Sequence, residues 1–252
     1  MQKPQSGSGI RRTQYDAVLF DLDGVITNTA SIHAACWKQM FDEYLQKRAA
    51  ACGEESCEFD IATDYLLHVD GKPRFDGVRD FLQSRGLRLP EGTRNDPPQA
   101  DTVCGLGNRK NDLVNKVIEE SGVEAYEGSV KLVRRLHGQG FKIAVVTSSQ
   151  NCNTVLKAAK LDAFFPVRVD GNMIHSQQLS GKPAPDTFLM AAALLGVEPS
   201  RAVVIEDAIS GVQAGRNGGF VLVIGVARKG NAEELRRNGA HTVVKDLEEL
   251  MD

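Results

Sequence analysis

The sequence predicts an α/β protein, in which a parallel sheet is covered by helices on both faces and a separate helical domain is inserted after the first strand. Two observations favour this fold class. From residue 123 to the end, apolar runs of strand length alternate with helical patterns, as they do in parallel sheets. The stretch 30–122 lacks such runs and shows helical spacing instead. The chain has 252 residues, of which 42% are hydrophobic, so it is long enough to bury a sizeable core.

The first predicted element is a buried strand at Ala17–Phe20, because four apolar residues stand together there. Gly24 then allows the chain to turn away from the strand. Residues 29–45 follow with apolar residues close to helical spacing, which predicts a helix that leaves the strand end. The candidate N-caps of this helix are Thr27, Asn28, Thr29 and Ser31.

The inserted domain is expected to be helical throughout. Apolar spacing predicts helices at 77–85 and 111–120, and turn residues cluster at 70–73 and 91–98. The start of the chain is rich in Gly, Ser and Gln, which predicts a disordered segment. We therefore expect a disordered lead-in at 1–12, a sheet domain at 13–29 and 123–252, and a helical cap at 30–122.

The second half supplies the rest of the sheet. The predicted strands are 142–147, a short one at 166–169, 202–205, 221–226 and 242–244. Helices are expected at 129–137, from Gly181 to about 195, and at 232–238. Because proline is tolerated early in a helix, this pattern places Lys182 just before the first turn of the second of these helices.

Composition argues against several classes of partner. Thirty basic and 33 acidic residues give a net charge of −3, which gives no reason to expect nucleic acid or an anionic membrane as a partner. No stretch approaches the ~20 apolar residues of a membrane span. The five cysteines are scattered and form no Cys-x-x-Cys, so neither a disulfide framework nor a zinc site is indicated. We expect a monomer in a reducing cytoplasm that acts on a small molecule.

Polar side chains stand where three of the predicted strands end. Asp21 and Asp23 follow the first strand, Thr147 ends the second, and Glu206 and Asp207 close the strand at 202–205. In a parallel sheet these ends lie on one edge, where ligands usually bind. Turn formation alone explains any single Asp-x-Asp-Gly, but not a coincidence at several strand ends. Crowded carboxylates repel one another, and oxygen ligands suit Mg²⁺, so Asp21, Asp23, Glu206 and Asp207 are the predicted metal-binding residues.

A cleft that holds a cation, a lysine and a hydroxyl suits a phosphate ester as substrate. We expect Asp21 to attack phosphorus and form an aspartyl phosphate. Asp23 would give a proton to the leaving oxygen and take one from the next acceptor. Thr147 and Lys182 would hold the transferring phosphoryl oxygens.

In the inserted domain the residue types alone do not decide between a role in ligand binding and an ordinary structural role. His33 and Trp37 are four apart and share a helix face, which serves either a ligand or core packing. Arg74 and Lys110 are cations that either meet an anionic ligand or are solvated.

Four segments resemble the four motifs of the haloacid dehalogenase-like superfamily. They are Asp21-Leu22-Asp23-Gly24-Val25, Thr147 after its strand, Lys182-Pro183-Ala184-Pro185-Asp186, and the run from Glu206-Asp207 to Gly215. Within this superfamily the chain is most similar to the β-phosphoglucomutases, which have a Rossmann-like core and a helical cap. The resemblance implies Mg²⁺-dependent interconversion of β-D-glucose 1-phosphate and glucose 6-phosphate through a bound bisphosphate.

The same resemblance extends to the cap. It implies a hinge at Thr29 and substrate contacts from His33, Trp37, Gly71, Arg74, Lys110, Ser148 and Asn151. The chain departs from the mutases at Asn28, at Thr147-Ser148, at Gly77 and in a longer cap with a loop near Asp96-Pro97-Pro98. A phosphatase that uses the same core is therefore an alternative, and a silent phosphosugar-binding protein is a third. Intact Asp21, Asp23, Lys182 and Asp207 argue against the third.

Overall fold

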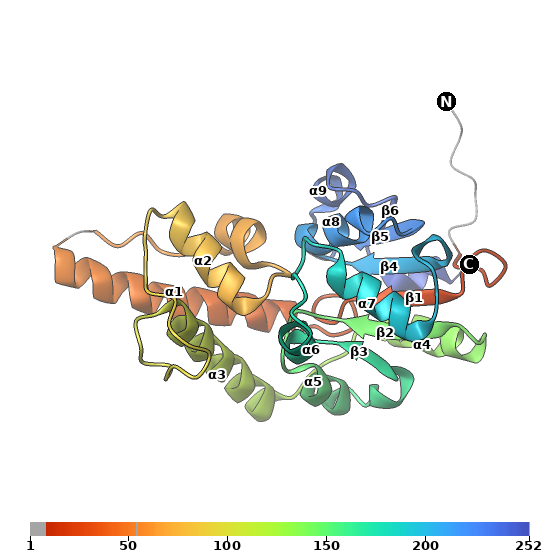
Figure 1. Ribbon diagram of the computed structural model, residues 1–252, viewed down its shortest axis with the longest axis horizontal. Helices are drawn as coiled ribbons and strands as arrows, with labels where there is room; N and C mark the ends of the chain where they lie inside the picture. Colours follow the sequence, from red (N-terminus) through yellow and green to blue (C-terminus); the bar gives the residue numbers. More distant parts are fainter. Residues whose placement is uncertain (1–8, 54, 252) are drawn as a thin grey trace. The chain divides into compact units, whose positions relative to one another are not determined.

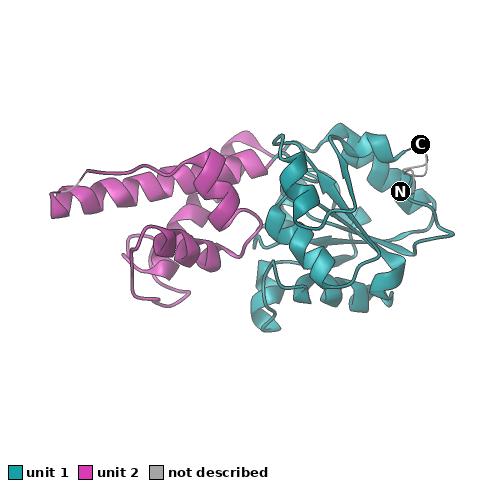
Figure 2. Ribbon diagram, turned by 90° about the horizontal axis from the view of Figure 1, so that it is seen from above, with its two compact units in different colours: residues 1–28, 124–252 teal, residues 29–123 magenta. Residues whose placement is uncertain are grey.

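The computed structural model describes residues 9–53 and 55–251 (Figure 1). Two compact units are distinguished (Figure 2). Unit 1 comprises the described residues up to Asn28 together with those from Glu124 onward, and unit 2 comprises residues 29–123. Within unit 1, the side chain of Ile10 is buried, and Arg12 pairs with Asp16 and lies over the Phe141 ring. Ile10 and Arg12 of the expected lead-in therefore contact unit 1, while residues 1–8 of that segment lie outside the described residues.

Unit 1 is built on a parallel sheet of six strands in the order β3-β2-β1-β4-β5-β6 (Figure 1). In register, Phe20 of β1 lies beside Val145 of β2 and Ile205 of β4, so these three strands end together. All six strands occur where apolar runs predict them. Their bounds are β1 Ala17–Phe20, β2 Lys142–Val146, β3 Val167–Val169, β4 Ala202–Glu206, β5 Leu222–Val226 and β6 Thr242–Val244.

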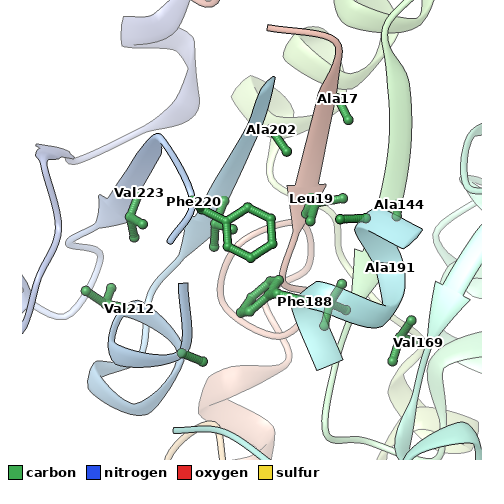
Figure 3. Packing of buried hydrophobic residues seen from close by; sticks show 14 of the residues in the cluster. Ala17, Leu19, Ala144, Val169, Phe188, Ala191, Ala202, Val212, Phe220 and Val223 are labelled. Atoms are coloured by element: carbon green, nitrogen blue, oxygen red, sulfur yellow. The ribbon is translucent and has the colours of Figure 1, made fainter. Parts of the chain in front are cut away.

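Side chains alternate between the two faces of the sheet and are buried on both. On one face Leu19 and Val223 pack with Phe188 and Val212 of the covering helices, as Figure 3 shows. On the other face the ring of Phe20 meets that of Phe165 edge to face, with centroids 6.1 Å apart. Burial on both faces explains why these strands appear in the sequence as continuous apolar runs.

The connections between strands are helical. They are α4 Glu127–Gly138, α5 Cys152–Ala158, η2 Asp162–Phe164, α6 Gly171–Ser176, α7 Asp186–Leu195, η3 Pro199–Arg201, α8 Ile209–Asn217, α9 Ala232–Arg237 and η4 Leu247–Leu250. The sequence pattern does not predict α5, α6 or α8. In α8 glycine as well as Val212 approaches the sheet: a Cβ on Gly215 would lie only 3.1 Å from side chains of Val204 and Val223. Apolar periodicity does not detect a helix that packs through glycine.

The helix expected from Gly181 begins only at Asp186. Proline stands at 183 and 185, and a residue that precedes proline is disfavoured in the helical region, so the segment 181–185 forms turns. Lys182 therefore lies in a loop before α7 rather than next to its first turn.

Unit 2 is helical, and its described residues include no strand. Its segments are α1 Ala30–Cys52, the wide π-helical turns η1 Ile61–Val69, α2 Arg74–Ser84 and α3 Val103–Ser121. The core is aromatic: the ring centroid of Phe41 lies 5.3 Å from that of Trp37, 5.2 Å from that of Phe59 and 4.1 Å from that of Phe81.

Two helices of unit 2 are longer than apolar spacing predicts. Helix α1 runs past Leu45 to Cys52 and ends at Gly53, whose φ of 70° is left-handed. Helix α3 begins at Val103, because Thr102 Oγ1 accepts a hydrogen bond from Gly105 N–H and caps it. Thr29 holds the N-cap position of α1 but makes no such capping bond. No helix in the described part of the chain has the length and apolar character needed to cross a membrane.

Candidate active site

Asp21 and Asp23 lie in the turn that follows β1. Asp21 N–H donates to the carbonyl of Ile205 at 2.9 Å, which extends the ladder by one residue and places the Asp21 side chain at the sheet edge. Gly24 turns the chain with φ of +93°, a conformation that favours glycine. Asp23 Oδ2 accepts a hydrogen bond of 3.1 Å from Thr147 Oγ1 at the end of β2. The two predicted strand ends are thus joined through their side chains.

Lys182 lies at the centre of the site, and its side chain is fully buried. Its ammonium donates to Asp21 Oδ1 at 2.5 Å, to Glu206 Oε1 at 2.6 Å and to the carbonyl of Val146 at 3.0 Å. The other Glu206 oxygen, Oε2, accepts from the backbone N–H groups of Asp207 and Ala208. One lysine therefore ties together the ends of β1, β2 and β4.

The electrostatics of this cluster favour a bound cation. Burial raises the pKa of Asp21 well above its ordinary value; Lys182 opposes this, while Glu206, Asp207 and Asp23 add to it. Burial likewise raises the pKa of Glu206. Burial alone would lower the pKa of Lys182, but the charges of Asp21 and Glu206 outweigh it and raise that pKa. The lysine is therefore charged, and a further cation at this site would favour the ionised forms of the carboxyl groups.

The carboxylates fit a metal ion. Asp21, Glu206 and Asp207 are buried and offer ligand oxygens that lie within 4.8 Å of one another. Asp207 Oδ2 is buried and accepts no hydrogen bond. It forms an ion pair with the Lys229 ammonium, which lies 2.9 Å away. An all-oxygen donor set of this kind suits a hard cation. Asp23, the fourth predicted ligand, lies outside this group, and its carboxylate accepts a hydrogen bond from Thr147.

The loop after Thr147 carries Ser148 and Asn151, both half-buried. Ser149 N–H donates to Thr147 Oγ1 at 3.0 Å, and Asn151 N–H donates to Ser149 Oγ at 3.1 Å, which folds the loop back onto the strand end. Ser148 and Asn151 are thus held at the same edge of the sheet as Asp21.

The loop after β5 takes part in the site, although the sequence analysis did not single it out. Arg228 Nε donates to the carbonyl of Gly24 at 3.0 Å, Lys229 pairs with Asp207, and Asn231 Nδ2 lies 3.4 Å from the carbonyl of Asp207. The signal was present in the sequence, since these polar residues directly follow a buried strand whose end belongs to the same edge.

In unit 2 the structure brings three predicted residues together. His33 and Trp37 lie one turn apart on α1, and Lys110 of α3 reaches both: its ammonium is 2.5 Å from His33 Nδ1 and 4.8 Å from the centroid of the Trp37 ring. Lys110 is only 5% exposed. A cation buried among a histidine and an aromatic ring does not fit the interpretation of a solvated surface lysine.

Arg74 is the first residue of α2 and follows the turn at Gly71, whose φ is 71°. Its Nε and Nη1 are buried and have no hydrogen-bond partner among the described residues. Burial, with help from the nearby charge of Arg94, lowers the pKa of Arg74. Buried guanidinium donors without partners are the groups that an anion would satisfy. Thr29, the remaining predicted contact, is buried at the start of α1.

The chain is similar to known proteins over nearly its full length. It is 51% identical to the β-phosphoglucomutase of Mycobacterium tuberculosis over 238 residues, which are 93% of this chain and 91% of that protein. A more distant relative is the fructose-1-phosphate phosphatase of Escherichia coli, at 27% identity over 82% of this chain and 94% of that protein. Among solved structures, the β-phosphoglucomutase of Clostridium difficile superposes with a TM-score of 0.72 at 25% identity, covering 94% of this chain and 93% of that one.

The family itself follows from the match of its profile. The profile described as haloacid dehalogenase-like hydrolase matches residues 15–219, which is well over half of the chain and includes every catalytic and metal-binding position predicted above. The chain belongs to the haloacid dehalogenase-like hydrolase family.

Proposed function

We propose that this protein is a phosphosugar mutase that interconverts β-D-glucose 1-phosphate and glucose 6-phosphate through an aspartyl phosphate and a bound bisphosphate. The observation that carries the proposal is the pairing of Asp21 with Lys182 and of Asp23 with Thr147 at one sheet edge, which offers a nucleophile beside a separate proton donor. The identity of 51% to a β-phosphoglucomutase supports the choice of substrate.

In the proposed first step, an oxygen of the Asp21 carboxylate attacks one phosphorus of the bound bisphosphate, and a sugar monophosphate is left. The new bond joins Asp21 to phosphorus, and the bond between phosphorus and the sugar oxygen breaks. Lys182 holds Asp21 in place through Oδ1 and supplies positive charge beside the transferring group. Asp23 protonates the leaving sugar oxygen, and the hydrogen bond from Thr147 keeps its carboxyl in position.

In the second step the phosphoryl group passes from Asp21 to the free hydroxyl of a bound sugar monophosphate, which forms the bisphosphate again. Asp23 takes the proton from that hydroxyl, and the Asp21 carboxylate is regenerated. The proposed ion is Mg²⁺, and Asp21, Glu206 and Asp207 are the proposed metal-binding residues, because their buried ligand oxygens lie within 4.8 Å of one another. When bound, Mg²⁺ would neutralise these carboxylates and the charge that develops on the phosphoryl oxygens.

The sugar and its second phosphate are assigned to residues outside this cluster. The partnerless donors of Arg74 suit the phosphate that is not transferred, and the buried Lys110 with His33 supplies a second positive group in unit 2. Thr29, Trp37, Gly71, Ser148 and Asn151 complete the proposed substrate contacts. We further propose that the enzyme acts as a monomer in the cytoplasm, where its five free cysteines stay reduced.

The test is an assay with MgCl₂, β-D-glucose 1-phosphate and a trace of the bisphosphate, in which glucose 6-phosphate and free phosphate are followed together. A mutase forms glucose 6-phosphate rapidly and releases little phosphate, and Asp21→Asn abolishes this turnover. Phosphate as the main product would contradict the mutase and support a phosphatase. That alternative is favoured by the relative that hydrolyses fructose 1-phosphate, since both activities share the aspartyl phosphate.

A further inference from the structure

Lys229 contacts the proposed metal site directly. Its ammonium lies 2.9 Å from Asp207 Oδ2, and the Asp207 side chain is 3% exposed while that of Lys229 is 25% exposed. The contact is therefore between a buried carboxylate and a cation that reaches it from the partly solvated side. Neither the four motifs nor the proposed mechanism uses this lysine.

The residues on both sides of Lys229 hold its backbone in place. The guanidinium of Arg228 donates to the carbonyl of Gly24 at 3.0 Å, to Asp246 Oδ2 at 2.7 Å and to Ser129 Oγ at 3.1 Å, and it lies 3.5 Å from the centroid of the Tyr126 ring. On the other side Asn231 is 6% exposed and its Nδ2 approaches the carbonyl of Asp207. Lys229 is thus presented to Asp207 by a fixed loop.

The two lysines of the site pair with different carboxylates. Lys182 contacts Asp21 and Glu206, and Lys229 contacts Asp207. Asp207 is one of the three proposed metal-binding residues. A divalent cation bound by Asp207 would share this carboxylate with an ammonium of the same sign, and like charges a few ångströms apart repel strongly in a partly buried site.

We propose that Lys229 sets the affinity of the metal site by competing with the divalent cation for Asp207. This inference rests on the metal site of the proposed function. Lys229 acts through Asp207 and is a positioning residue. It compensates the charge of Asp207 when the metal concentration is low, and it keeps metal binding weak enough to depend on that concentration.

The test is isothermal titration calorimetry with MgCl₂, repeated with MnCl₂, on the wild type and matched variants. Lys229→Met removes the ammonium and should tighten binding of both metals about tenfold or more, given a like-charge contact in a partly buried site. Lys229→Arg keeps the charge and should stay within threefold of the wild type. Lys157→Met makes the same change of net charge at an exposed position on α5 and should bind like the wild type.

Two results would overturn the role of Lys229: unchanged or weaker metal binding by Lys229→Met, or an equal gain in Lys157→Met. The variant Asp207→Asn separates this outcome from a failure of the proposed function. If Asp207→Asn loses the metal that the wild type binds while Lys229→Met is unchanged, only the lysine's role fails. If the wild type binds neither metal, the metal site and the inference fail together. Lys229→Gln repeats the test if the methionine variant does not fold.

Discussion

Lys182 Nζ and Glu206 Oε1 lie 2.6 Å apart, and neither side chain is more than 1% exposed. The same ammonium contacts Asp21, so this buried pair ties the nucleophile's strand to the strand that carries the proposed metal-binding acids. Charges taken so far from water persist only because each is paired and hydrogen-bonded.

The first prediction follows from this pair. Lys182→Met leaves two buried carboxylates without their cation and should lower the free energy of unfolding by about 3–5 kcal/mol. The double variant Lys182→Met/Glu206→Gln removes one of the stranded charges as well and should be less destabilised than the sum of the two single variants. Urea denaturation of the wild type, the two single variants and the double variant gives the coupling free energy between Lys182 and Glu206. Additive losses would contradict a direct interaction between the two charges.

The second prediction concerns the proposed acid and base. Asp23→Asn keeps an oxygen that accepts the hydrogen bond of Thr147 but cannot exchange a proton, so kcat should fall by about 10²- to 10⁴-fold. Metal affinity should stay within about threefold of the wild type, because Asp23 lies outside the group of three clustered ligand oxygens. Turnover preserved within severalfold would refute the assigned role. The assay is the mutase assay, combined with a MgCl₂ titration.

The third prediction concerns Gly24. A Cβ at this position would lie 2.2 Å from Asp207 Oδ2, and φ of +93° is strained for any other residue. Gly24→Ala should displace the Asp207 carboxylate, weaken Mg²⁺ binding and lower the free energy of unfolding by about 1–3 kcal/mol.

The control for this change is Gly219→Ala. Its φ of +70° brings the same kind of strain, but a Cβ there meets no atom within 4 Å. It should therefore lower stability while leaving Mg²⁺ affinity unchanged, as measured by thermal unfolding and calorimetry. Equal metal affinity in both variants would show that Gly24 serves the turn alone.

The fourth prediction concerns Arg74. Its buried donors are assigned to the phosphate that is not transferred, so Arg74→Ala should raise KM for β-D-glucose 1-phosphate by about tenfold or more, since a charge-assisted contact to phosphate is lost. Hydrolysis of a simple phosphate ester, which has no second phosphate to bind, should be unaffected. Arg88→Ala, an exposed arginine of the same unit, is the control. Wild-type kinetics on the sugar would contradict the assignment.

The fifth prediction concerns pH. Burial would raise the pKa of Asp246, but the hydrogen bonds from Arg228 and from the Glu248 backbone, together with the charges of Arg228 and Lys131, outweigh burial and lower that pKa below 3.8. A carboxyl whose pKa is lower in the folded protein than in the unfolded protein stabilises the fold at pH values above the pKa of the unfolded state. This stabilisation is lost as the pH falls through the pKa of the folded state. Asp246→Asn should therefore unfold at a lower temperature than the wild type at pH 6–7, and the difference should shrink below about pH 4. Melting curves across this range provide the measurement, and a constant difference would exclude the charge as the cause.

The sequence by itself determined the sheet and the chemistry at its edge. The central strands β1 and β4 are marked by apolar runs because a strand buried on both faces must be apolar throughout, whereas the edge strands β3 and β6 are short and half-buried. The residues assigned to one edge, because parallel strands end together, were Asp21, Asp23, Thr147, Glu206 and Asp207. Lys182 was expected beside the phosphoryl group from its place before a predicted helix. These inferences need only local pattern and the topology that it implies.

Only the tertiary structure decided which charges meet. Lys182 bridges Asp21 and Glu206 across 161 and 24 residues of sequence, and Lys229 reaches Asp207 from a loop that carries no motif. Helix α8 escaped prediction because glycine contributes to its packing, and the hydrogen bond from Thr147 to Asp23 follows from the fold alone. Periodicity records whether a residue is buried, but a contact depends on the side-chain direction and on distances across the sheet, and these exist only once the chain has folded.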